Sequence, residues 1–238
     1  MKTFKTRGLI LREYEAGESD KRLVILCKGH GRLLVYARGA RNPKSKFLAS
    51  SQLLTYGDFV LADGRQFFSM AQAQAIENFY PIRQDYDLLC HAAYILEICE
   101  KAVPERSPCD ELLQLALKTL QHISIQDIPA KQAVIVFLFR FILFYGLNPE
   151  MDFCSVCSGD LAGSMLFCDE GMICKNCTSK ARVMLSDSSY YAIRHILESD
   201  LKQSFLFRIE EAVLKELSQT ANLCWLGHFQ IPLQTDIL

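Results

Sequence analysis

Two closely spaced cysteine pairs are the feature that most constrains this fold. Cys154 and Cys157 form one C-x-x-C motif, Cys174 and Cys177 form a second, and sixteen residues separate the pairs. Cysteines separated by two residues can place both sulfurs on one metal ion, and two such pairs complete the tetrahedral sulfur shell that Zn²⁺ prefers. Thiolates would fill every coordination position of the ion, so no position stays open for a water ligand. The spacing therefore predicts one structural Zn²⁺ in a zinc ribbon.

The composition of this stretch leaves alternatives open. Two redox-active dithiols, or a loop stapled by disulfides, would use the same cysteine pairs. Leu166 and Phe167 can form the hydrophobic strand of a ribbon, which favours the metal. Cys168 is a fifth sulfur and could replace Cys174 only with a less usual spacing, so we assign it as a spare thiol.

The other cysteines indicate a reducing compartment. The chain has ten, and the five outside this stretch lie in apolar segments, where free cysteine behaves as a small buried hydrophobe. Residues 1–14 contain Lys2, Lys5, Arg7 and Arg12 with no apolar block between them, so no signal peptide is predicted. The longest apolar stretch, residues 133–145, contains Arg140 and is shorter than the roughly 20 residues needed to span a bilayer. We expect a soluble, cytoplasmic protein with reduced thiols.

Charge is distributed unevenly along the chain. Residues 1–80 contain thirteen Lys and Arg against seven Asp and Glu, whereas the remainder contains thirteen against twenty. The length and the 50% hydrophobic content fit one large domain or two modest ones. A basic module joined to an acidic one predicts an anionic partner for the first part.

The first eighty residues have the pattern of β-strands separated by glycine turns. The expected strands are residues 4–14, 21–27, 33–38, 52–62 and 66–76. Tight turns are expected at residues 28–32 and 62–65. This number of strands favours a small closed barrel, and the OB-fold is the commonest architecture of that kind. An SH3-like barrel is the main alternative, because strand number alone does not separate the two.

From residue 81 onward the apolar period is helical. We expect helices ending near Pro104, beginning at Ser107–Asp110, over residues 130–145, from Ser186 or Asp187, and over about residues 205–223. The third is apolar nearly all round, which is typical of the buried centre of a bundle. The predicted architecture is α+β: an OB-fold over residues 1–80, a helical domain over residues 81–150 and 181–238, and a four-cysteine zinc ribbon over residues 151–180.

A basic segment follows the third expected strand. Its cations are Arg38, Arg41, Lys44 and Lys46. In a barrel this segment is an exposed loop, and such loops bind nucleic-acid backbones by neutralising phosphates. The aromatic candidates for stacking on unpaired bases are Phe47, Tyr36, Phe67 and Phe68, of which two are expected in the core. A solvated loop without a ligand is the alternative interpretation.

Five motifs occur along the chain in the order of a known family. They are Arg7-Gly8-Leu9-Ile10-Leu11, Tyr14-Glu15-Ala16-Gly17-Glu18-Ser19-Asp20, Gly29-His30-Gly31-Arg32, Ala37-Arg38-Gly39-Ala40-Arg41 followed by Lys44-Ser45, and the ribbon with Phe167 ahead of Gly171. Together they resemble the RecO family of bacterial recombination mediators over the whole chain. Cys168 is an additional thiol, and Glu170 stands where a second glycine is usual. Neither departure removes a metal ligand.

The resemblance implies a DNA repair and recombination mediator without enzymatic activity. Such a protein binds single- and double-stranded DNA, anneals complementary strands and helps load recombinase onto DNA coated by single-strand-binding protein, in a RecFOR-type pathway. The implied partners are RecR, single-strand-binding protein and, functionally, RecA, while the participation of RecF stays open. The implied location is the cytoplasm, at the nucleoid. Some relatives lack the cysteines, which supports a folding role for the metal.

The expected roles of the cations follow from this resemblance. We expect the basic loop to hold phosphates of two strands at once, which lowers their mutual repulsion. Lys21, Arg22 and Arg32 are second-rank candidates, because strand polarity decides which face they occupy. Arg140 is the candidate contact for the acidic, hydrophobic tail of single-strand-binding protein, on the resemblance alone.

Two other function classes compete with this interpretation. An enzyme would need a catalytic constellation, and the sequence has no G-x-x-x-x-G-K-[ST], H-x-E or H-E-x-x-H run. The alternative function is a zinc-ribbon adaptor that binds nucleic acid and is associated with RNA or with the transcription or translation machinery. A strand-annealing assay separates these classes.

Overall fold

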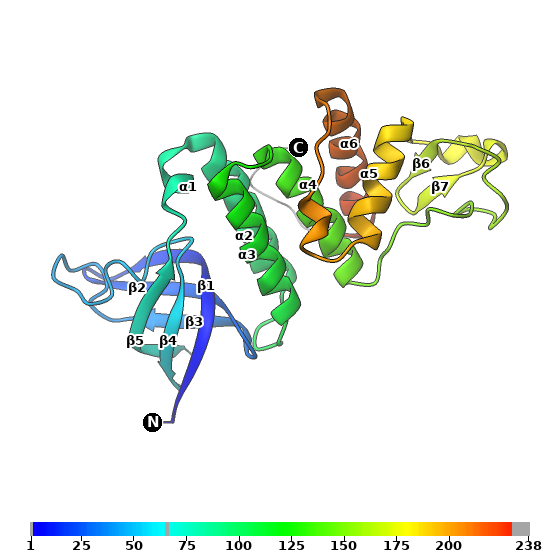
Figure 1. Cartoon of the computed structure of the whole chain (residues 1–238). Coiled ribbons are helices and arrows are strands. Elements are labelled where there is room, and N and C mark those ends of the chain that lie inside the picture. The colour runs from blue at the N-terminus through cyan, green and yellow to red at the C-terminus, as the bar shows by residue number, and fades with distance from the viewer. Residues whose placement is uncertain (1, 65–66, 230–238) are drawn as a thin grey trace. The chain divides into compact units, whose positions relative to one another are not determined.

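A computed structural model describes residues 2–64 and 67–229 of the chain. The chain divides into two compact units, Met1–Ile125 and Gln126–Leu238. The first unit combines a β-barrel with helices, and the second combines helices with a small sheet (Figure 1). The predicted α+β class is therefore confirmed.

The described strands of the first unit close into a barrel. They are β1 (Thr3–Ala16), β2 (Asp20–Cys27), β3 (Gly31–Ala37), β4 (Tyr56–Ala62) and β5 (Phe68–Glu77). Their order around the barrel is β1-β2-β3-β5-β4, and β4 pairs with β1 to close it. The pairing between β3 and β5 is parallel, whereas the other pairings are antiparallel. This topology is that of the OB-fold, which resolves the choice between the two expected barrels.

The barrel core is built from alternate residues of the strands. In β3, Leu33, Val35 and Ala37 are buried, while the residues between them are partly exposed, as period-2 alternation requires. Phe47 comes from the segment between β3 and β4, is only 6% exposed and joins the same core. Phe68 packs partly against this core. Phe47 is thus one of the predicted aromatic residues that belong to the core.

Helices α1 (Tyr80–Gln84), α2 (Tyr86–Ala102) and α3 (Asp110–Ile125) complete the first unit. Asp85 caps α2, because its side chain accepts hydrogen bonds from the backbone N–H groups of Asp87 and Leu88. The turn between β2 and β3 packs tightly against the segment between α2 and α3. A Cβ atom at Gly31 would lie 1.9 Å from the carbonyl oxygen of Ser107.

The second unit has helices and a small sheet. Its helices are α4 (Ala130–Phe144), α5 (Asp187–Glu198) and α6 (Glu211–His228), with the 3₁₀ segments η1 (Lys175–Lys180) and η2 (Gln203–Phe205). Strands β6 (Leu166–Cys168), β7 (Gly171–Ile173) and β8 (Val183–Met184) form a sheet with β6 in the middle. Residues from Gln132 to Phe139 of α4 are all buried, so its predicted central position is confirmed.

Two predicted boundaries differ from the structure. The strand expected over residues 52–62 begins at Tyr56, because Leu54 has a left-handed backbone (φ 65°) and hydrogen-bonds to Ile10 outside the β4 ladder. The last helix begins at Glu211, because the chain forms the η2 turn and then an extended link before it. Arg65 and Gln66, included in an expected turn and strand, lie outside the described residues.

Each helix within residues 2–64 and 67–229 is too short or too polar to span a lipid bilayer.

Candidate metal centre and nucleic-acid interface

The predicted cysteine ligands converge on one point. The sulfurs of Cys154, Cys157, Cys174 and Cys177 all lie within 4.8 Å of one another. The Sγ atoms of Cys157 and Cys174 are 3.8 Å apart. A tetrahedral site with Zn–S bonds of about 2.3 Å requires sulfur separations of about 3.8 Å. The four cysteines therefore form a site that could hold one metal ion.

Tight turns in the backbone bring each cysteine pair together. In the first turn, the N–H of Ser158 donates to the carbonyl of Cys154 at 2.7 Å, and Ser158 has a left-handed backbone (φ 56°). In the second turn, the N–H of Cys177 donates to the carbonyl of Cys174 at 3.0 Å. The pairing of β6 with β7 connects the turns, as the ribbon interpretation requires.

Gly171 is required by a close approach within the ribbon. Its φ of +134° suits glycine, and an added Cβ atom would lie 2.3 Å from the carbonyl oxygen of Glu150. That carbonyl accepts a hydrogen bond from the N–H of Met172 at 2.7 Å. Gly171 therefore lets the chain before the first cysteine pair lie against β7.

The surroundings of the site lower the pKa of one cysteine thiol and raise that of another. Backbone N–H groups, first that of Cys174 and then those of Cys157 and Val156, lower the pKa of the Cys154 thiol to about 6. Burial, together with neighbouring sulfurs, raises the pKa of the Cys177 thiol to about 12. A cation would replace the proton of Cys177 and make all the sulfurs thiolates, since a coordinating thiol is deprotonated.

Cys168 lies beside this site but outside the converging set. It is 1% exposed, and its Sγ lies 3.4 Å from the hydroxyl of Ser155. Its side chain belongs to the small core under the ribbon, together with Ile173. Its burial in this core, outside the four converging sulfurs, is compatible with a spare thiol.

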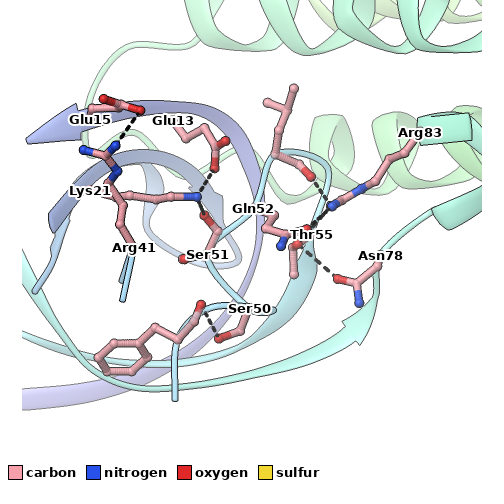
Figure 2. Close-up of polar contacts among 12 residues, drawn as sticks. Glu13, Glu15, Lys21, Arg41, Ser50, Ser51, Gln52, Thr55, Asn78 and Arg83 are labelled. Carbon is pink, nitrogen blue, oxygen red and sulfur yellow. Dashed lines mark hydrogen bonds and ion pairs between the residues drawn. The ribbon is translucent and has the colours of Figure 1, made fainter. Parts of the chain in front are cut away.

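Two predicted cations of the barrel form ion pairs with β1 (Figure 2). Lys21 Nζ lies 2.8 Å from Glu13 Oε2 and donates to the carbonyl of Ser51 at 3.2 Å. Arg41 Nη2 lies 3.0 Å from Glu15 Oε1. The Lys21 side chain is only 15% exposed. Both cations therefore join β1 to the segment between β3 and β4.

Arg83 of α1 holds the other end of this segment, as Figure 2 shows. Its guanidinium donates to the side chain of Gln52, to the carbonyl of Leu53 and to the hydroxyl of Thr55. The Thr55 hydroxyl in turn donates to Asn78 Oδ1 at 3.1 Å. Burial lowers the pKa of Arg83. One side chain thus ties three nearby residues of this segment to α1.

Asp20 fixes the start of the basic loop. Its carboxylate accepts hydrogen bonds from the Tyr36 hydroxyl at 2.5 Å and from the backbone N–H of Gly39 at 2.7 Å. These bonds, the first being the stronger cause, lower the pKa of Asp20. A glycine with φ of +65° at position 39 lets the chain turn out of β3 at this point.

Other cations remain directed to solvent. Arg22, Arg38 and Lys44 are exposed, and within the described ranges their side chains form no ion pair or hydrogen bond. Lys46 is also exposed; its Nζ donates to the carbonyl of Ala71 at 3.2 Å and lies 4.8 Å from the ring centroid of Phe47.

One outer face of the barrel adjoins this loop. Arg22 pairs with Tyr14 across β1 and with Tyr36 across β3, and directly paired residues place their side chains on the same side of a sheet. Tyr14 is 43% exposed. The structure therefore places two tyrosines and one cation together where the basic loop leaves β3.

The remaining predicted residues occupy partly buried positions. Arg32 Nε donates to the carbonyl of Val103 at 2.8 Å, and its Nη2 lies 3.8 Å from Glu105. Arg140 Nη1 donates to the carbonyls of Ile196 and Ser199 at 3.2 and 2.8 Å, which ties α4 to the end of α5.

The anchoring residues Glu13, Asp20 and Arg83 were not identified from sequence. Arg83 lies about thirty positions from the residues that it holds. Only Asp20 carried a signal, as the last residue of the turn motif that begins at Tyr14.

Sequence comparisons agree with these observations. Residues 1–79 match the family described as "Recombination protein O N terminal", and residues 83–236 match "Recombination protein O C terminal". A "DNA repair protein RecO" of Acetivibrio thermocellus is 34% identical over 227 residues, which cover 93% of this chain and 90% of the relative. The protein of the same name from Alkaliphilus metalliredigens is 31% identical over 223 residues, which cover 90% and 91%.

A third relative, "DNA repair protein RecO" of Bacillus pumilus, is 33% identical over 178 residues, which cover 74% of this chain and 69% of the relative. Both family matches together span nearly the whole chain. The chain therefore belongs to the RecO family of DNA repair proteins, which are recombination mediators and not enzymes.

Proposed function

We propose that this RecO protein binds single- and double-stranded DNA through its barrel, anneals complementary strands and helps load recombinase onto DNA coated by single-strand-binding protein. The observation that carries the proposal is that some cations of the barrel form ion pairs with β1 whereas others are exposed. Lys21 and Arg41 are held by β1 carboxylates, whereas Arg22, Arg38 and Lys44 are exposed beside them. The anchored loop and the neighbouring strand β2 thus present exposed cations that form no ion pair within the described residues.

The proposed mechanism is electrostatic and forms no covalent bond. Arg22, Arg38, Lys44 and Lys46 bind phosphates, and the release of condensed counterions supplies a salt-dependent driving force. When two strands are held at once, the loop lowers the repulsion between their backbones, and pairing is faster. Lys21, Arg32 and Arg41 contribute by positioning the loop and the neighbouring hairpin.

The tyrosine face contributes contacts that do not depend on charge. Tyr14 and Tyr36 flank Arg22 in register, next to the loop. Aromatic side chains stack on any base, since every base has a π-face. Binding without sequence preference is what annealing of arbitrary complementary strands requires.

For the cysteine site we propose one structural Zn²⁺, held by Cys154, Cys157, Cys174 and Cys177. An all-sulfur set suits a soft or borderline cation and leaves no open position. The bound ion would supply folding energy to the ribbon and no reaction chemistry. The sulfur separations and the lowered pKa of Cys154 support this assignment.

For the second unit we propose contacts with proteins, namely RecR and the acidic tail of single-strand-binding protein. RecF and the recombinase RecA are further members of the proposed cytoplasmic pathway. Arg140 is the proposed contact for a tail carboxylate. Its Nη1 is occupied by two carbonyls, so Nη2 and Nε would bind the tail.

Strand annealing tests the proposal directly. Wild type is compared with the loop variant Arg38→Ala/Lys44→Ala/Lys46→Ala and with the control variant Arg208→Ala/Lys202→Ala/Lys215→Ala, which removes the same number of exposed cations from the second unit. We expect the loop variant to anneal complementary oligonucleotides at least about tenfold more slowly and the control to anneal normally. Equal loss in both variants would refute a role for the loop, and wild type that binds folded RNA without annealing DNA would support the adaptor alternative.

A further inference from the structure

A second candidate site lies at the other end of the barrel strands. The basic loop follows the end of β3 at Ala37, whereas a cleft of about 430 Å³ opens where β2 turns into β3. Its lining includes Phe4, His30, Phe68, Lys2, Arg106 and Asp63. Binding clefts for small organic groups are typically about 300 to 1,000 Å³. The cleft thus has room for a nucleotide-sized group.

Aromatic rings from two strands and a turn meet in this cleft. The rings of Phe4 and His30 are 4.4 Å apart between centroids and inclined by 42°. The rings of Phe4 and Phe68 are 5.6 Å apart and nearly perpendicular. Phe4 and Phe68 are only partly buried, so they line the cleft while they pack against the barrel core. This arrangement offers stacking surfaces at the edge of the core.

A guanidinium is held over one of these rings. The central carbon of the Arg106 guanidinium lies 5.1 Å from the centroid of Phe68. Arg106 has a left-handed backbone (φ 57°), a region that non-glycine residues seldom adopt. Its N–H donates to the carbonyl of Arg32 at 3.0 Å, which fixes this conformation. Neither Arg106 nor Lys2 forms an ion pair within residues 2–64 and 67–229.

The geometry points to a binding site for one unpaired base of single-stranded DNA, with Phe4, His30 and Phe68 stacking on the base and with Lys2 and Arg106 next to its phosphate. The inference rests on the proposed DNA-binding function and adds a second contact point to it. A free phosphate fits less well, because it would leave the rings of Phe4, His30 and Phe68 without a stacking partner. The Asp63 carboxylate, which lines the same cleft, can accept a hydrogen bond from an exocyclic amino group of a base.

Abasic DNA separates base stacking from phosphate binding. Wild type, Phe4→Leu and Phe68→Leu are titrated with a single-stranded oligonucleotide and with an abasic oligonucleotide of equal length. Leucine keeps apolar volume for the core but lacks a π-face. We expect each variant to lose about five- to tenfold in affinity for the normal oligonucleotide, because stacking contributes about 1–3 kcal/mol per base. Affinity for abasic DNA should stay within about twofold of wild type.

Controls separate failure of this inference from failure of the proposed function. Tyr86→Leu removes an aromatic side chain that is 83% exposed outside the cleft, and it should bind both oligonucleotides normally. A wild type that shows no salt-dependent affinity for DNA would remove the proposed function as a whole. Wild-type binding with Phe4→Leu and Phe68→Leu unchanged, or weakened equally for normal and abasic DNA, would overturn the base site alone.

Photocrosslinking locates the base independently of affinity. An oligonucleotide with one 5-iodouracil is bound to the wild-type chain, and the complex is irradiated. The crosslinked peptide is then mapped by mass spectrometry. We expect a crosslink at Phe4, His30 or Phe68. Crosslinks found only outside the cleft, for example at Tyr14 or Tyr36, would contradict the inference.

Discussion

The ammonium group of Lys21 lies 2.8 Å from the carboxylate of Glu13, across the first two strands of the barrel. The same ammonium donates to the carbonyl of Ser51, so it connects the barrel to the chain that leads into β4. Its neighbour Arg22 is exposed on the opposite face of β2. The adjacent cations therefore have different surroundings: Lys21 positions the loop, and Arg22 is available for the proposed contact with DNA.

Substitution of these neighbours tests the difference. Lys21→Ala should lower the free energy of unfolding by about 1–2 kcal/mol, because it removes an ion pair and a charged hydrogen bond that are largely shielded from water. Arg22→Ala should change stability by less than about 0.5 kcal/mol and reduce the slope of log affinity against log salt by about 0.7 for single strands. Urea denaturation and DNA titrations at several salt concentrations measure both effects. A larger loss of salt slope in Lys21→Ala than in Arg22→Ala would reverse the assignment.

Arg83 should be the main anchor of the segment before β4. Arg83→Ala leaves the carbonyl of Leu53 and the amide oxygen of Gln52 without their donor, which costs about 1–3 kcal/mol. Arg83→Lys should recover little, since an ammonium lacks the planar fork that reaches separate acceptors. Urea midpoints of both variants test this, with exposed Arg22→Ala as the control. Full recovery by lysine would show that only the charge matters.

The anchoring role of Asp20 predicts a pH dependence. Hydrogen bonds from Tyr36 and Gly39 lower its pKa in the folded state, so its contribution to stability is present above its ordinary pKa and is lost as pH falls through the lower folded value. The stability difference between wild type and Asp20→Asn should therefore be constant from about pH 7 to about pH 5 and shrink below about pH 4. Denaturation curves over this range measure it. A difference that grows on acidification would contradict the assigned contacts.

Removal of one sulfur from the converging set should remove the metal. Cys174→Ala should reduce bound zinc from about one per chain to near zero and lower the melting temperature of the second unit. Cys168→Ala is the matched control, because this thiol is also buried but lies outside the site. Metal analysis and thermal melts provide the measurements. Zinc retained by Cys174→Ala, or lost from Cys168→Ala, would identify a different ligand set.

Local patterns predicted the elements of the fold well. Alternating apolar residues in β3 and the apolar surface of α4 correspond to the burial that the structure shows. The cysteine spacing predicted the converging sulfurs because short turns determine that geometry. In these cases the burial or the turn depends on residues that are close together in the sequence.

The anchoring contacts could not be predicted, because their partners are far apart in sequence. Arg83 reaches Gln52 and Leu53 only once the barrel has closed and α1 has packed beside it. Lys21 and Arg22 are adjacent cations in sequence, and the structure gives Lys21 a carboxylate partner in Glu13 while Arg22 is exposed. The cleft proposed to bind a base likewise includes Arg106, which comes from the segment between α2 and α3.

The most direct test of the central claim is the salt dependence of single-stranded DNA affinity. The claim is that exposed cations of the anchored loop bind phosphates. In the variant Arg38→Ala/Lys44→Ala/Lys46→Ala, the slope of log affinity against log salt should fall by about 2 relative to wild type, since each lost phosphate contact contributes about 0.7. An unchanged slope in the folded variant would show that the loop does not contact DNA.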